Sequence, residues 1–105
     1  MPPDGDKQLA AIRQQIAELD RLAQQTCQDL NTVAGTERVA KWKSRTVALI
    51  TVAVGHEDGQ MFDRIDPGPS FTNDMLEEFT DLIECYRTPL VRLADKLSRP
   101  SSPGG

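Results

Sequence analysis

Apolar residues at alternating spacings of three and four positions recur in three segments of this chain, and this pattern constrains the fold most strongly. Because an α-helix has about 3.6 residues per turn, residues at these spacings share one helix face and can be buried together. The sequence therefore predicts an all-α fold with coiled-coil-like packing: either a three-helix bundle or a long helical hairpin with an additional helix. The predicted core positions are Leu9, Ile12, Ile16, Leu19, Ala23, Thr26, Leu30 and Val33 in the first segment, Val39, Trp42, Thr46, Leu49 and Ala53 in the second, and Leu76, Phe79, Ile83, Tyr86, Leu90, Leu93 and Leu97 in the third.

Capping and helix-breaking residues predict where the three helices begin and end. Asp6, Thr36 and Thr72 have side chains that can accept a hydrogen bond from a backbone N–H in the first helical turn. Gly35 is suited to ending the first helix, and Pro89 should bend the third helix without dividing it. The predicted helices accordingly cover residues 6–33, 36–54 and 72–97.

One helical domain over residues 6–97 is expected, with flexible tails at 1–5 and 98–105. Within it, residues 55–71 are predicted to connect the second and third helices and to fold back over the bundle. A β-hairpin within residues 47–65 is the alternative, because this stretch combines β-branched residues with an Asp-Gly turn signal. We favour the helix, since polar and apolar residues do not alternate there and a lone hairpin is marginally stable in water.

The predicted lengths of the first two helices favour self-association. A first helix of roughly 28 residues would be ~42 Å long, and the second would cover about two thirds of it. Part of the first apolar face would then contact water in a monomer. A homo-oligomer would bury that remainder.

The composition excludes several classes of protein. The 105 residues include 12 basic and 16 acidic side chains, for a net charge of −4. This balance argues against a protein that coats DNA, and two cysteines are too few for a disulfide scaffold. The longest apolar run, Val47–Val54, is too short to cross a membrane, and we find no secretory signal. We therefore expect a cytoplasmic protein that does not engage a membrane.

Charged residues are unevenly distributed along the chain. Bases gather at the start of the second predicted helix, where the helix dipole disfavours them, and acids gather at the start of the third. The two patches could pair with each other, within one chain or between copies, or the basic patch could bind an acidic partner protein, phosphate or nucleic acid. Trp42 could be a core anchor or an exposed aromatic anchor for a partner. The basic patch consists of Arg38, Lys41, Lys43 and Arg45, and the acidic patch of Asp74, Glu77, Glu78, Asp81 and Glu84.

No arrangement of residues typical of catalysis or metal binding is recognisable. The single histidine, His56, lies in an acidic stretch whose spacing matches neither an EF-hand loop nor a zinc-binding helix. Cys27 and Cys85 are far from it in sequence, and no motif pairs a thiol with a base. We therefore expect a protein that is not an enzyme and that needs no metal or cofactor.

Two stretches resemble a helical segment of bacterial multidomain proteins. Trp42-Lys43-Ser44-Arg45-Thr46, followed by Phe62 and by Phe71-Thr72-Asn73-Asp74, is similar to the segment that precedes TIR-like effector domains in defence or stress proteins. The resemblance covers roughly residues 39–97 and implies a non-catalytic module that assembles or regulates an effector. The effector half is absent from this sequence.

Together these features predict a bacterial interaction or oligomerisation module. In this interpretation apolar faces drive association, and the basic and acidic patches select the partner and its orientation. The alternative is a small nucleic-acid-associated regulator that uses the basic patch.

Overall fold

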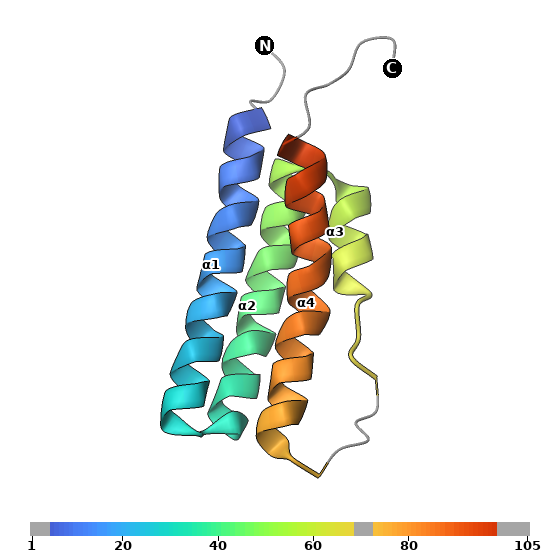
Figure 1. The fold of residues 1–105 in the computed structure, drawn as a ribbon. Coiled ribbons are helices and arrows are strands. Elements are labelled where there is room, and N and C mark those ends of the chain that lie inside the picture. Colours follow the sequence, from blue (N-terminus) through green and yellow to red (C-terminus); the bar gives the residue numbers. More distant parts are fainter. Residues whose placement is uncertain (1–4, 69–72, 99–105) are drawn as a thin grey trace.

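The computed structural model describes residues 5–68 and 73–98, and these residues are almost entirely helical (Figure 1). The prediction of an all-α fold is confirmed, and the β-hairpin alternative is wrong because residues 47–53 and 56–63 are helical. The described residues form α1 (Gly5–Asp29), α2 (Thr32–Ala53), α3 (His56–Asp63) and α4 (Met75–Ser98).

The three long helices form a bundle to which the short helix α3 is added. Helix α2 runs antiparallel to α1, and α4 packs on both of them in the same direction as α2 (Figure 1). Helix α3 packs against α2 and runs back along it. The resulting molecule is elongated, with extents of 50 × 23 × 20 Å.

The core is built mainly from the predicted apolar faces, but Ile50 and Phe62, which were not predicted as core positions, are also buried. Leu30 and Val33 were predicted to be buried, but they are 67% and 63% exposed. Both follow the last residue of α1, so neither lies on its apolar face. The buried apolar residues are Ile12, Leu19, Val39, Trp42, Ile50, Phe62, Phe79, Ile83, Tyr86 and Leu90.

An aromatic cluster at the centre of the core connects the helices. The ring of Trp42 on α2 lies 6.0 Å from that of Phe62 on α3 and 6.2 Å from that of Tyr86 on α4. Its indole N–H donates to the backbone carbonyl of Gln15 on α1 over 3.0 Å. The hydroxyl of Thr46 and the side-chain oxygen of Gln15, also buried, are 3.0 Å apart. These polar groups are therefore satisfied inside the core, as burial requires.

The corner between α1 and α2 lies earlier in the chain than predicted. Leu30 adopts a left-handed conformation, with φ of 56°, and ends α1 after Asp29 instead of at residue 33. Asn31, not Thr36, then caps α2. Thr36 lies inside α2, where its hydroxyl donates to the carbonyl of Thr32.

Gly35 lies inside α2 and does not end α1, because the two helices approach each other closely there. A Cβ atom on Gly35 would lie 2.5 Å from the Thr26 hydroxyl oxygen and 2.9 Å from the Phe79 ring. Both distances are shorter than ordinary van der Waals contacts. The glycine is therefore needed for its small size and not for a turn.

The connector between α2 and α4 contains helix α3, which was not predicted. Glu57 and Asp58 place negative charge in its first turn, where the helix dipole favours it. Phe62 is buried in the bundle and holds α3 in place.

The observed lengths of α1 and α2 do not favour self-association as the predicted lengths did. Helix α2 has 22 residues and α1 has 25, so α2 covers most of α1 and not two thirds of it. The core residues of the described helices are buried within one chain.

The start of α4 and the ends of the chain differ from the prediction in detail. The Asp74 carboxylate accepts from the backbone N–H of Leu76 over 3.0 Å and of Glu77 over 3.2 Å, as an N-cap does. The predicted cap, Thr72, lies outside the described residues. Helix α4 continues through Pro89, as predicted. Of the predicted tails, only Gly5 and Ser98 are described, and both are helical.

We predict that Gly35→Ala destabilises the protein by about 1 to 3 kcal/mol, because the added methyl group overpacks the contact with α1 and α4. Unfolding in denaturant, followed by the fluorescence of Trp42, measures the change. Ser44→Ala, at an exposed position of α2, is the matched control and should stay within about 0.5 kcal/mol of the wild type.

The cost of Gly35→Ala should shrink in a Thr26→Ala background, which removes the nearest obstructing atoms. An unchanged midpoint for Gly35→Ala would contradict the close approach of the helices.

Candidate binding surface

The four residues of the predicted basic patch occupy three different environments in the structure. Arg38, Lys41 and Arg45 lie along one side of α2 at spacings of three and four residues. Lys43 is two positions from Lys41, which corresponds to about 200° around the helix axis, and so it points to another side. The prediction of one continuous patch is therefore wrong for Lys43.

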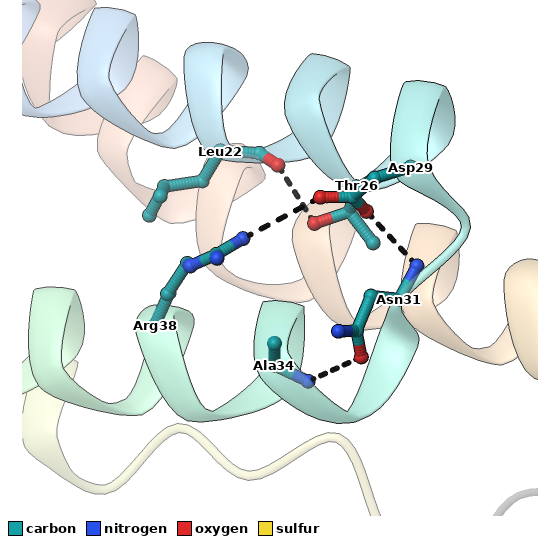
Figure 2. Close-up of polar contacts among 6 residues, drawn as sticks. All are labelled: Leu22, Thr26, Asp29, Asn31, Ala34 and Arg38. Carbon is teal, nitrogen blue, oxygen red and sulfur yellow. Dashed lines mark hydrogen bonds and ion pairs between the residues drawn. The ribbon is translucent and has the colours of Figure 1, made fainter.

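Arg38 is held by the corner between α1 and α2 (Figure 2). Its Nη1 atom lies 3.9 Å from Oδ2 of Asp29, and both side chains are about two-fifths exposed. Asp29 also accepts from the backbone N–H of Asn31 over 2.9 Å, and the Asn31 side chain accepts from that of Ala34 over 3.1 Å. Because Nη1 is shielded from water and has no hydrogen-bond partner, the ion pair compensates its burial. The Arg38 side chain therefore takes part in a contact within the fold and remains partly exposed.

The ammonium group of Lys43 makes its contacts within the fold. This group donates to the carbonyls of Asp63 over 3.0 Å and of Ile65 over 2.9 Å, at the end of α3. It also lies 5.1 Å from the centre of the Tyr86 ring, within the range of a cation–π interaction. A cation is favourable at this position because the carbonyls at a helix C-terminus carry partial negative charge. Lys43 therefore fixes α3 to α2.

Lys41 and Arg45 begin an exposed stripe that continues to the end of α2. Ala48 and Val52 extend it at the same alternating spacing, and Val52 is 88% exposed. We call Arg38, Lys41, Arg45, Ala48 and Val52 the basic face of α2. It combines cations in its first half with a small apolar area in its second half, a combination suited to an acidic protein surface.

The acidic patch lies on the side of α4 that faces away from the core. All five of its residues are exposed. Asp74 has a structural role as the cap of α4. The two ion pairs described, Arg38–Asp29 and Arg87–Asp20, connect α1 to α2 and α1 to α4, and neither of them connects the two patches.

Trp42 is not an exposed aromatic anchor for a partner. Its side chain is completely buried at the centre of the bundle. The interpretation as a core anchor is confirmed.

A shallow apolar groove separates α3 from α4, and sequence reasoning missed it. Its volume is about 200 Å³. The 3–4 spacing of Asp58, Met61, Phe62 and Ile65 was the signal that could have revealed α3, and with it the groove. The groove is lined by Asp58, Met61, Phe62, Ile65, Pro89, Leu90 and Leu93.

The residues considered for chemistry, Cys27, His56 and Cys85, belong to α1, α3 and α4. His56 is the exposed first residue of α3, and both cysteines are free thiols. Over residues 5–68 and 73–98, no three His, Cys, Asp or Glu side chains are grouped so that they could hold a metal ion. None of the helices in the described part of the chain is both long and apolar enough to pass through a membrane.

No known protein family, curated protein sequence or solved structure matches this chain. Its function is therefore inferred from its own surfaces.

We predict that Lys43→Met destabilises the protein by about 1 to 2 kcal/mol, because two carbonyls at the end of α3 lose a charged donor. Lys41→Met, on the exposed face of the same helix, is the matched control and should change the stability by less than about 0.5 kcal/mol. Thermal unfolding by circular dichroism measures both. Equal effects of the two substitutions would contradict the role of Lys43 in fixing α3.

We predict that Cys85 reacts with a thiol reagent at least ~10-fold more slowly than Cys27 near pH 8, because the thiolate is the reactive form. Burial raises the pKa of Cys85. The negative charge of Asp66 raises this pKa further, and the positive charge of Lys43 lowers it. Cys27, in contrast, is exposed. Because its pKa is raised, the rate at Cys85 should keep increasing as the pH rises above the usual range for a thiol.

The single variants Cys27→Ser and Cys85→Ser assign each rate, and denatured protein should show similar rates at both positions. Faster labelling of Cys85 in the native protein would contradict its shielded position.

Proposed function

We propose that this chain is a non-enzymatic helical protein–protein interaction module that binds an acidic surface of a partner protein through the basic face of α2. The observation that carries the proposal is the exposed stripe on α2, where Lys41 and Arg45 are followed by Ala48 and Val52. Cations alone would suit any polyanion. The adjoining apolar residues favour a protein surface, which offers apolar contacts beside its charges.

The position of Lys43 also favours a protein partner over nucleic acid. With Lys43 bound to the end of α3, the basic face presents three cations, and one of them is paired with Asp29. Aromatic side chains, on which bases would stack, do not belong to this face. Nucleic-acid binding, the alternative from the sequence, therefore has less support.

The resemblance to segments that precede TIR-like effector domains supports one class of partner. A module of this kind would assemble or regulate a bacterial effector by binding an acidic face on it. The rigid bundle would then act as a docking platform, with the charges on α2 setting the orientation of the partner.

Charge reversal on the basic face tests the proposal. A partner protein is recovered from the producing cells with the tagged wild-type chain, purified, and titrated against wild type and Lys41→Glu/Arg45→Glu by calorimetry. The double variant should bind at least ~10-fold more weakly, because like charges then oppose each other.

Arg21→Glu/Arg64→Glu is the matched control. It makes the same change in net charge at exposed positions outside the basic face and should bind like the wild type. Equal weakening by both double variants, or the absence of any protein that binds the purified chain, would refute the proposal. So would binding of a labelled oligonucleotide at about 50 mM salt that Lys41→Glu/Arg45→Glu abolishes.

A further inference from the structure

Helix α4 carries an exposed stripe that is as long as the basic face of α2. Its residues follow one another at intervals of four, three, four and three positions, and all are exposed. Acids occupy the first half, and Val91, which is 41% exposed, ends the second half. We call Glu77, Asp81, Glu84, Thr88 and Val91 the acidic face of α4.

The two faces are complementary in sequence order. When the two helices are aligned in parallel, Arg45 can be paired with Glu84 and Val52 with Val91, because Arg45 and Val52 are seven positions apart on α2, as Glu84 and Val91 are on α4. Arg38 falls opposite Glu77 in the same alignment, and Lys41 falls one position before Asp81. A parallel contact between the two faces would thus place cations against carboxylates and valine against valine.

The architecture prevents this contact within one chain. Helices α2 and α4 run in the same direction (Figure 1), and the buried residues of both belong to one shared core. The basic face and the acidic face consequently point away from each other. A second copy in the same orientation can bring its acidic face against the basic face of the first, with the two helices parallel.

We propose that copies of this chain associate side by side and head to tail, with the basic face of α2 in one copy docked on the acidic face of α4 in the next. This inference rests on the proposed function and identifies a second copy as one acidic partner of the basic face. Because the contact joins two different surfaces, each added copy still offers a free face, so association continues beyond two copies.

The contact should be weak and sensitive to salt. Lys41, Arg45, Asp81 and Glu84 are all exposed, and exposed charges are screened as ionic strength rises. The wild type should therefore associate at high protein concentration and about 50 mM salt, and return to monomers at about 500 mM salt.

Complementary charge reversals test the pairing of the two faces. Lys41→Glu/Arg45→Glu gives a chain with two acidic faces, and Asp81→Lys/Glu84→Lys gives a chain with two basic faces. Each double variant alone should be monomeric in sedimentation equilibrium at about 50 mM salt. An equimolar mixture should regain the association of the wild type, since the two faces match again between the variants.

Circular dichroism confirms that each variant is folded, and Arg21→Glu/Arg64→Glu controls for net charge and should associate like the wild type. A wild type that stays monomeric at every concentration, a mixture that stays monomeric, or association that stops at two copies would overturn the inference. A monomeric wild type that still binds its partner protein through the basic face would leave the proposed function intact, whereas loss of both results would refute both.

Discussion

The burial of Trp42 is the interaction on which the rest of the fold depends. Its ring contacts an aromatic side chain from α3 and another from α4, and its N–H reaches a backbone carbonyl of α1. A tryptophan side chain buries about 150 to 250 Å², so this one residue contributes a large share of the apolar contact at the centre of the bundle. The hydrogen bond to Gln15 makes that burial compatible with the polar N–H. All four helices therefore meet at one side chain, and the surfaces on α2 and α4 keep their positions because of it.

The apolar faces could be predicted because they depend only on helical periodicity. Leu19, Ile50 and Leu90 fall on these faces or beside them, and all are fully buried. The corner between α1 and α2 could not be predicted in the same way. Leucine has no preference for the left-handed conformation that Leu30 adopts, whereas the glycine at position 35 resembled a helix end. The role of Gly35 depends on Thr26 and Phe79, and no local signal connects these residues.

The charged surfaces could be predicted only in part, because some of their side chains make tertiary contacts that the sequence does not reveal. The acidic residues of α4 are close in sequence and are all exposed. The bases of α2 are close in sequence but not in space, because Lys43 points toward α3. Helix α3 is short, and its role depends on Phe62 entering a core built by other helices. Side chains that act within a tertiary contact are the ones that sequence patterns alone do not identify.

The left-handed backbone at Leu30 has a further consequence for how the sequence can vary. The left-handed conformation is less favourable by about 1 to 2 kcal/mol for a residue with a Cβ atom. Because Leu30 is two-thirds exposed, burial of its side chain offsets little of this cost. Glycine or asparagine would adopt the same backbone more easily. The corner between α1 and α2 is therefore a place where a single substitution, Leu30→Gly or Leu30→Asn, can add stability to the fold.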